Sequence, residues 1–156
     1  MNGNNIPKKP LKVLFVSIDA LIGDMAWIVK KEGHEVKYYI QSKDQRDVCD
    51  GFVDKVDDWK EHSDWADVIV FDDFGFGEDA ERLRKAGKLV VGGSVYTDKL
   101  EMDREFGQAE MKSVDISIIP RWNFDDFDEA VEFIIKTPDR YVLKPSGLAQ
   151  NEKELL

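Results

Sequence analysis

Two apolar runs separated by an amphipathic stretch constrain the fold of the first forty residues. Residues 11–18 (LKVLFVSI) and 35–40 (EVKYYI) have the length and the β-branched and aromatic content of buried strands. Between them, apolar residues recur at helical spacing (Leu21, Met25, Ile28 and Val29), and Gly33 stands where a helix ends in the left-handed conformation. This order predicts a β-α-β unit with parallel strands and a right-handed crossover.

The same alternation continues to about residue 95. It predicts a small doubly wound α/β domain over residues 11–95, with a parallel sheet and helices on both faces. A polar and basic segment, residues 1–10, precedes it and is expected to be a disordered tail. The further predicted elements are strands at 51–56, 67–71 and 88–91 and a helix at 78–86 that ends before Gly87.

The pattern changes in residues 96–156, which we interpret as a second, partial subdomain. Asp98 and Glu101 resemble a capping box at the start of a charged helix, and Asp125 or Asp126 caps a later amphipathic helix. The last strand has no later strand to pair with, so either it pairs with the strand at 115–120 alone or the chain is cut from a longer protein, which is the interpretation we favour. The predicted elements are a helix at 98–112, a strand at 115–120, a helix with the stripe Phe127, Ala130, Val131, Ile134 and Ile135, and a strand at 141–144.

Charge and cysteine content exclude several classes of function. The chain has 22 Lys and Arg against 32 Asp and Glu, a net charge of −10, which disfavours binding to nucleic acid or to an anionic membrane. No apolar run reaches the ~18 residues that a membrane span needs. One cysteine and two histidines predict neither a disulfide nor a zinc site, and favour a reducing cytoplasm. Dinucleotide, P-loop, serine-hydrolase and zinc-protease motifs do not occur.

Two polar loops follow predicted strands, at the edge where open α/β sheets bind ligands. Asp72, Asp73 and Gly75 lie in the first, where the carboxylates could hold a cation or a polar substrate. The alternative is a solvated turn that caps the next helix. The second loop is Gly92-Gly93-Ser94, whose backbone amides could meet an anion. The alternative there is a tight turn.

Two cations are candidate phosphate ligands. Lys144 ends an apolar strand, where a positive charge is expensive to bury without an anionic partner. The alternative is a strand-end lysine that reaches water. Without further context, Arg104 is expected to be a surface arginine on a helix.

Residues 92–147 resemble the start of an ATP-grasp ligase, and most closely of the phosphoribosylamine–glycine ligase family. The family has a helix of the form L-E-x-[ST]-[KR]-x-F after a glycine turn, and this chain has LEMDREF at 100–106. A short strand ending in proline and a helix containing Glu129-Ala130 follow in the same order. The family's V-V-K-x-[DS]-G strand is matched by YVLKPSG at 141–147.

The resemblance implies a Rossmann-like pre-ATP-grasp domain followed by the beginning of a small ATP-grasp α+β subdomain. It implies that Arg104 and Lys144 contact the phosphates of ATP, with Mg²⁺ held by residues outside this chain. The implied reaction is an ATP-dependent ligation of purine biosynthesis through an acyl phosphate, with small-molecule amine and carboxylate substrates such as phosphoribosylamine and glycine. This chain by itself is expected to be inactive.

Two other interpretations stay open. One is a non-catalytic α/β ligand-binding or regulatory module that keeps an ATP-grasp remnant. The other is a carboxylate–amine ligase with a different substrate, because the family's first loop is glycine-rich and this one reads Ser17-Ile18-Asp19-Ala20. The sequence leaves the oligomeric state open.

Overall fold

The computed structural model describes residues 9–144, which form two compact units, one ending at Asp98 and the other beginning at Lys99. Lys9 and Pro10, the end of the expected tail, are exposed, and the rest of that tail lies outside the described residues. The loop Pro145-Ser146-Gly147 also lies outside them.

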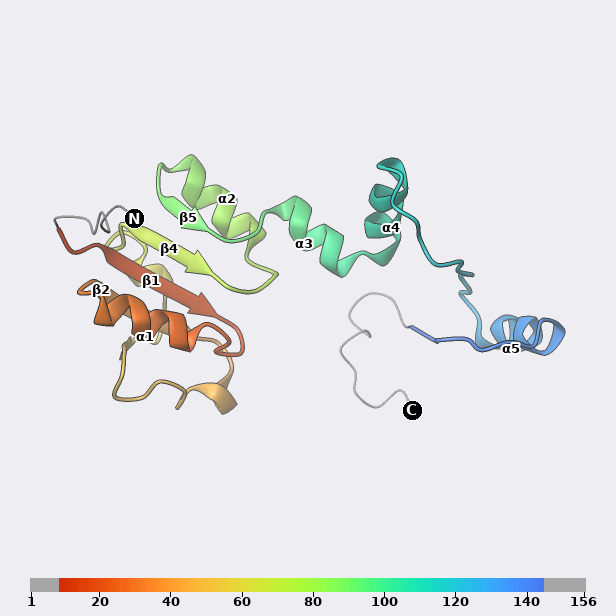
Figure 1. The fold of residues 1–156 in the computed structure, drawn as a ribbon, viewed down its shortest axis with the longest axis horizontal. Coiled ribbons are helices and arrows are strands. Elements are labelled where there is room, and N and C mark those ends of the chain that lie inside the picture. The colour runs from red at the N-terminus through yellow and green to blue at the C-terminus, as the bar shows by residue number, and fades with distance from the viewer. Residues whose placement is uncertain (1–8, 145–156) are drawn as a thin grey trace, which may run out of the picture. The chain divides into compact units, whose positions relative to one another are not determined.

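The first unit is built on a five-stranded parallel sheet (Figure 1). The strand order is β3-β2-β1-β4-β5, so β1 and β4 lie side by side at the centre although 50 residues separate them in sequence. In the register, Val16 of β1 pairs with Phe71 of β4. The strands are β1 (Lys12–Ser17), β2 (Glu35–Ile40), β3 (Asp54–Lys55), β4 (Val68–Phe71) and β5 (Leu89–Val91).

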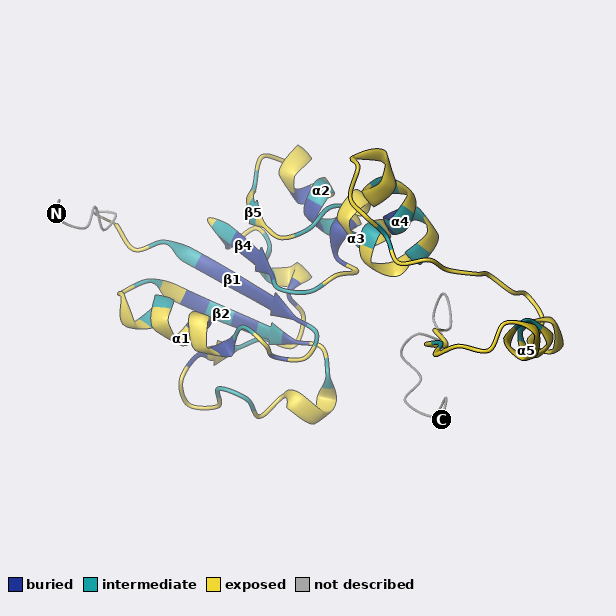
Figure 2. Cartoon of the chain, turned by 45° about the vertical axis from the view of Figure 1, so that its right-hand side comes forward, coloured by how far each residue is buried: buried dark blue, intermediate teal, exposed yellow. Residues whose placement is uncertain are grey.

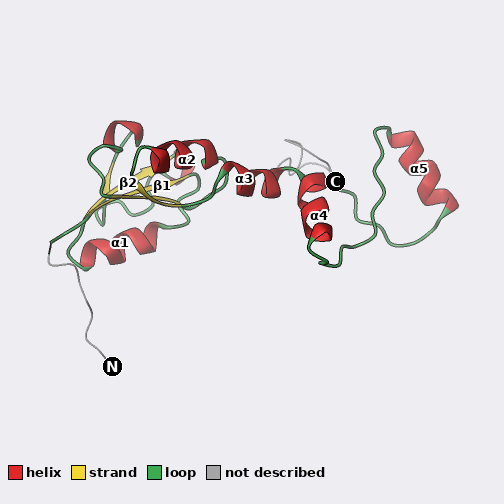
Figure 3. Cartoon of the chain, turned by 90° about the horizontal axis from the view of Figure 1, so that it is seen from above, coloured by secondary structure: helices red, strands yellow, loops and turns green. Residues whose placement is uncertain are grey.

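Helices cover both faces of this sheet, as Figure 3 shows from above. Helix α1 (Gly23–Lys31) packs on one face and α2 (Gly77–Lys85) on the other, and short 3₁₀ turns η1 (Lys43–Gln45) and η2 (Lys60–His62) lie in the connections. Side chains of β1 alternate between two cores: Phe15 packs on the α1 side, and Leu14 and Val16 on the α2 side. The predicted doubly wound α/β fold is confirmed.

Local predictions in the first unit hold to within a residue or two, with two corrections. Gly33 has φ +94° at the end of α1, as expected. The strand predicted at 51–56 shortens to Asp54–Lys55. Helix α1 buries its small residues Gly23 and Ala26, whereas Leu21, Met25 and Ile28 are exposed, because small side chains let the helix backbone approach the sheet.

One predicted helix is two. Instead of a continuous helix over 98–112, the chain forms α3 (Val95–Met102) and α4 (Arg104–Ser113), with Asp103 between them. The Asp103 carboxylate accepts a hydrogen bond from the Phe106 amide at 2.9 Å, so it starts a new helix. Asp98 lies inside the first turn of α3 and does not cap it. Asp126, one of the two predicted caps, accepts from the amides of Asp128 and Glu129 at the start of α5 (Phe127–Lys136).

The strands predicted at 115–120 and 141–144 were wrong. Neither segment is a strand, and residues 99–144 contain none, because an extended apolar segment becomes a strand only when a neighbour pairs with it. The stripe of α5 is also largely exposed (Figure 2): Phe127 is 73% and Ile135 72% exposed. Instead, Phe133 on the opposite side of α5 packs against Trp122, Phe124 and Tyr141.

Candidate functional site

The first unit has one topological switch point, where β1 and β4 lie side by side but lead to helices on opposite faces. In open α/β sheets, ligands bind at the carboxyl ends of such strands. Ser17 and Asp72 are the residues at these two ends, next in register after Val16 and Phe71. The Ser17 hydroxyl, which is fully buried, donates to Asp72 Oδ2 at 2.6 Å. A polar pair therefore marks the switch point.

A third polar group, the Tyr38 hydroxyl, lies at the same place. Tyr38 of β2 is fully buried, and neither its hydroxyl oxygen nor Asp72 Oδ1 has a hydrogen-bond partner among the described residues. Burial, with a smaller contribution from the nearby Asp72 carboxylate, raises the pKa of Tyr38 to about 12. The Ser17 hydroxyl and the Ile22 amide lie close to both groups and lower both pKa values.

Asp72 is half-buried, and burial raises its pKa above the usual range for an aspartate. The hydrogen bond from Ser17 acts against this shift, while the charge of Asp73 adds to it. Two of the predicted site residues, Asp72 and Asp73, are thus electrostatically coupled. A buried carboxyl with a perturbed pKa in a strand-end site is a typical feature of functional sites.

The rest of this loop has a local role. Asp73 Oδ1 accepts from the Phe74 amide at 2.9 Å and closes its own turn, and Gly75 has φ +89°. The alternative interpretation, a turn that caps α2, is right about the turn but wrong about the cap: neither carboxylate of this loop caps α2, whose first amide, at Gly77, donates to Asp98 Oδ2 at 2.7 Å. Gly75 borders a polar hollow of about 420 Å³ on the α2 side of the sheet, which Tyr39, Trp59 and Asp79 also line.

The Gly92-Gly93-Ser94 loop is held by α2. The Arg84 guanidinium donates to the carbonyls of Gly92 and Gly93, both at 2.7 Å, and to that of Val90 at 3.4 Å. The Ser94 amide donates to Thr97 Oγ1 at 2.6 Å. A side chain at position 93 would meet that same hydroxyl, with Cβ at 2.7 Å. Side chains of α2 and α3 therefore hold this loop, and the Ser94 amide is not free for an anion. Anion binding by the amides of Gly92 and Gly93 stays a prediction.

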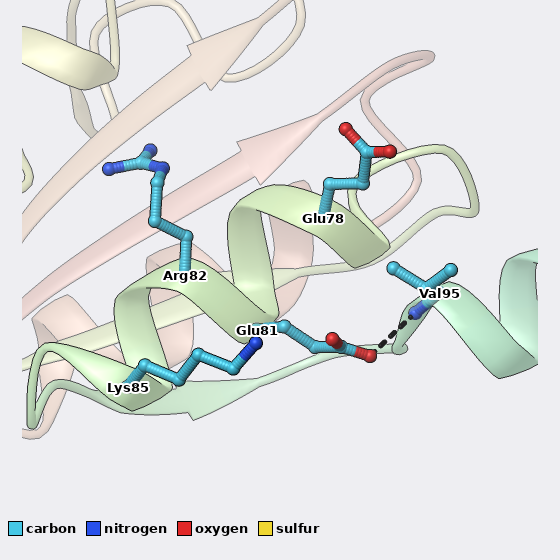
Figure 4. Close-up of a pocket in the computed structure, with 5 residues that line it drawn as sticks. All are labelled: Glu78, Glu81, Arg82, Lys85 and Val95. Carbon is cyan, nitrogen blue, oxygen red and sulfur yellow. Dashed lines mark hydrogen bonds between the residues drawn. The ribbon is translucent and has the colours of Figure 1, made fainter.

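Helices α2 and α3 begin with reciprocal contacts. While Asp98 of α3 accepts from the Gly77 amide, Glu81 of α2 accepts from the Val95 amide at 3.0 Å (Figure 4). A Cβ at position 77 would lie 2.4 Å from the Ser94 carbonyl carbon. The open hollow of about 320 Å³ beside these contacts is lined by Glu78, Glu81, Arg82, Lys85 and Val95. These contacts between α2 and the residues at the start of α3 have a structural role, which is to hold the first turn of α3 against α2.

The two predicted phosphate ligands lie in the second unit. Arg104 is half-buried at the first position of α4, and Lys144 is exposed at the end of an irregular segment. Their joint action on a triphosphate stays a prediction. Among residues 9–144 there is no group of three or more His, Cys, Asp or Glu that could hold a metal ion. No helix in that range is long and apolar enough to cross a membrane.

Sequence reasoning missed Ser17 and Tyr38. Ser17 carried a usable signal, because it is a polar residue at the carboxyl end of an apolar strand that is predicted to be central. Tyr38 carried none: in a strand that reads EVKYYI, nothing distinguishes a tyrosine whose hydroxyl reaches the switch point from one that only packs.

No protein-family profile matches the chain. Solved structures that share its fold include two synthetases. One is N5-carboxyaminoimidazole synthetase from Staphylococcus aureus, complexed with ADP, at a TM-score of 0.60 and 16% identity over 81% of this chain. The other is N5-carboxyaminoimidazole ribonucleotide synthetase from Thermotoga maritima, at a TM-score of 0.58 and 15% identity over 79% of this chain. This chain covers 36% of each synthetase, so it spans about a third of their length.

Proposed function

We propose that this chain is the N-terminal part of an ATP-dependent carboxylate–amine ligase of the ATP-grasp kind. The observation that carries the proposal is the shared fold: about four fifths of the chain superpose on two synthetases, one of them complexed with ADP. In this proposal the first unit is the Rossmann-like pre-ATP-grasp domain. The second unit is the beginning of the small ATP-grasp subdomain, and the protein acts in the cytoplasm.

The proposed reaction has two steps. A carboxylate oxygen of one substrate attacks the γ-phosphorus of ATP, which gives an acyl phosphate and releases ADP. The amine of the second substrate then attacks the acyl carbon, the C–O bond to phosphate breaks, and an amide and inorganic phosphate result. Catalysis of this kind depends mainly on positioning and on neutralising phosphate charge.

Each part of the chain has a role in this scheme. Lys144 and Arg104 would bind phosphate oxygens of ATP, because cationic side chains form strong charge-assisted hydrogen bonds with phosphate. Mg²⁺, when bound, would share the phosphate charge, held by carboxylates beyond those described here. The switch point at Ser17, Tyr38 and Asp72 would face the substrate that does not carry the triphosphate.

The more specific proposal is a phosphoribosylamine–glycine ligase of purine biosynthesis. It is supported by the LEMDREF segment at 100–106 and the YVLKPSG segment at 141–147, which resemble that family in order and spacing. The two synthetases with the same fold are named for a carboxyaminoimidazole product, whereas joining glycine to phosphoribosylamine gives a glycinamide. The general ligation chemistry therefore has broader support than this particular substrate pair.

The proposal is tested by ADP release from the complete protein, as its gene encodes it, in a coupled assay. We expect release that needs both a carboxylate and an amine, with glycine and freshly formed phosphoribosylamine as the first pair. Omission of either substrate should lower the rate at least tenfold. ADP release that is indifferent to both substrates, or no release with any pair, would count against a ligase.

The second candidate, a non-catalytic ligand-binding or regulatory module, is favoured by one observation. The first unit by itself contains a polar group, Ser17, Tyr38 and Asp72, in which two buried oxygen atoms have no partner among the described residues, so a ligand site can exist there without the rest of a ligase. Calorimetry of the 156-residue chain with ATP and Mg²⁺ separates the two candidates. Micromolar affinity would favour a self-sufficient module, and absence of binding is expected for part of a ligase.

A further inference from the structure

We propose that the switch point binds the amino group of the amine substrate, as a primary ammonium held by Asp72 Oδ1 and Tyr38 Oη, and that it does not hold a phosphate. The ammonium is the resting form, and it gives up one proton, to Asp72 or to water, before the free amine attacks the acyl carbon. The proposal rests on the proposed ligase function for the role of the amine. The existence of the site itself is argued only from contacts and buried atoms of the first unit.

Two buried oxygen atoms at this place lack partners. Asp72 Oδ2 is occupied by the Ser17 hydroxyl at 2.6 Å, which leaves Oδ1 buried without a hydrogen-bond donor in residues 9–144. The hydroxyl oxygen of Tyr38, on a side chain that is fully buried, is also unpartnered among the described residues. Buried polar atoms without partners are costly, so each needs an explanation. An ammonium donates to several acceptors at once and would satisfy both oxygens.

The charge at this edge favours a cation. Besides Asp72, the β1–α1 loop contributes Asp19 and the β4–α2 loop contributes Asp73. None of these three carboxylates forms an ion pair with a lysine or arginine in residues 9–144. A protonated amine would supply the missing counter-charge, and an additional anion would be repelled.

The same edge lacks the features that hold phosphate. Helix α1 begins at Gly23, and the carboxylate of Asp24 in its first turn accepts from the Met25 amide at 2.7 Å. An acidic side chain therefore already occupies the positive end of the helix dipole, where a phosphate would otherwise bind. The loop between β1 and α1, Ile18 to Ile22, contains no glycine that would bring backbone amides close to an anion.

The test is an NMR titration of ¹⁵N-labelled 156-residue chain at constant ionic strength. Ethanolamine is the amine probe, and ethylene glycol is its matched control, in which a hydroxyl replaces the ammonium. Ribose 5-phosphate and inorganic phosphate are the anionic probes. We expect ethanolamine to shift the amide signals of Ser17, Ile22 and Asp72, with an affinity at least tenfold above that of ethylene glycol, and the anions to leave these signals in place.

Two variants assign the effect to the two oxygens. Asp72→Asn should weaken ethanolamine binding about tenfold or more, which corresponds to ~1.4 kcal/mol. Tyr38→Phe, which keeps the ring and loses only the hydroxyl, should weaken it severalfold while the chain stays folded. Asp67→Asn is the matched control, because Asp67 precedes β4 as Asp72 follows it. The Asp67 side chain accepts a hydrogen bond from the Lys12 amide at the amino-terminal ends of β1 and β4, opposite to the candidate site.

Several results would overturn the inference. In the titration these are equal affinity for ethanolamine and ethylene glycol, binding of ribose 5-phosphate at these amides, or no binding of ethanolamine. In the variants the contradicting result is an unchanged affinity for ethanolamine in both, which would leave a buried water as the partner of the two oxygens. Failure of the proposed ligase function is visible separately in the ADP-release assay. Amine binding without ADP release would remove the ligase and keep this site.

Discussion

At the residue scale, the most unusual feature of the molecule is the group formed by Ser17, Tyr38 and Asp72. It places a carboxylate and a phenol against a core that is otherwise apolar, and in the described part of the chain one carboxylate oxygen and the phenol oxygen have no hydrogen-bond partner. Such groups lower the stability of the free protein, and proteins tolerate that cost mainly where a ligand binds. Two variants therefore have predictable effects on stability that are opposite to their effects on binding.

Tyr38→Phe should not destabilise the ligand-free chain. The variant removes a buried hydroxyl that has no hydrogen-bond partner, and an unsatisfied buried group costs about 1–3 kcal/mol. We expect the free energy of unfolding to stay the same or rise by ~1 kcal/mol in urea denaturation. A loss of more than 1 kcal/mol would mean that the hydroxyl makes a stabilising bond in the free protein.

Asp72→Asn should change how stability depends on pH. Because burial raises the pKa of Asp72, the folded state binds its proton more tightly than the unfolded state does. The contribution of this carboxyl is therefore fully present at low pH and is lost as the pH rises through the interval between the unfolded and the folded pKa. Asparagine does not titrate, and its amide oxygen can still accept from Ser17.

We accordingly expect the stability of Asp72→Asn relative to the wild type to increase between pH 3 and pH 7, measured by urea denaturation at both pH values. The control is again Asp67→Asn, which removes one negative charge at the other end of β4. The same pH trend in the control would mean that general charge repulsion, and not the burial of Asp72, causes the effect.

At the scale of elements, the reciprocal contacts between α2 and α3 fix how the chain leaves the sheet. The Gly77 amide donates to Asp98, the Val95 amide donates to Glu81, and Arg84 holds the intervening turn. Each helix thus supplies a side chain that satisfies the first amide of the other. The same loop requires glycine at two positions: Gly92 has φ +150° and a Cβ there would lie 3.0 Å from Phe71 Cβ, and a Cβ at position 93 would lie 2.7 Å from Thr97 Oγ1.

Gly77→Ala tests this packing. Alanine is a better helix former than glycine by about 1 kcal/mol, so an isolated α2 would gain stability. Here the new Cβ would lie 2.4 Å from the carbonyl carbon of Ser94. We expect a net loss of about 1–3 kcal/mol in the free energy of unfolding, as in other overpacked sites. Glu78→Ala, at the exposed next position, is the control and should change stability little.

The sequence predicted the elements of the first unit well, because strands such as β2 are central or nearly central and their apolar runs reflect two-sided burial. Gly33 and Gly87 also ended their helices as predicted. The second unit was predicted less well. Its segments 115–120 and 141–144 have the composition of strands, but composition cannot supply the neighbour with which a strand pairs.

The candidate site was only partly visible in the sequence. Asp72 could be predicted because it follows a strand, but its contact with Ser17 depends on the strand order, which joins residues 55 positions apart. The role of Tyr38 depends on which face of β2 it occupies. Asp98 was misread as a cap of its own helix, because its partner, the Gly77 amide, is on another helix.

At the scale of the whole molecule, the two units are proposed to have different tasks. In the proposed ligase the first unit would present a polar switch point to the amine, and the second would carry the cations that bind ATP. Lys144→Ala in the complete protein should lower kcat/KM for ATP at least tenfold, and Arg104→Ala severalfold. Circular dichroism should show that both variants keep the α/β fold, because neither residue belongs to the sheet. Normal turnover in both would remove the phosphate assignment.

The most direct test of the account follows the oxygen atoms of the carboxylate. If the complete protein forms an acyl phosphate, one oxygen of the carboxylate leaves with the phosphate group when the amine attacks the acyl carbon. With ¹⁸O-labelled glycine, ATP and phosphoribosylamine, mass spectrometry should therefore find one ¹⁸O atom in each inorganic phosphate released. Product formed with unlabelled phosphate would contradict the acyl phosphate, and the absence of any ATP-dependent product with these or other amine–carboxylate pairs would contradict the ligase assignment itself.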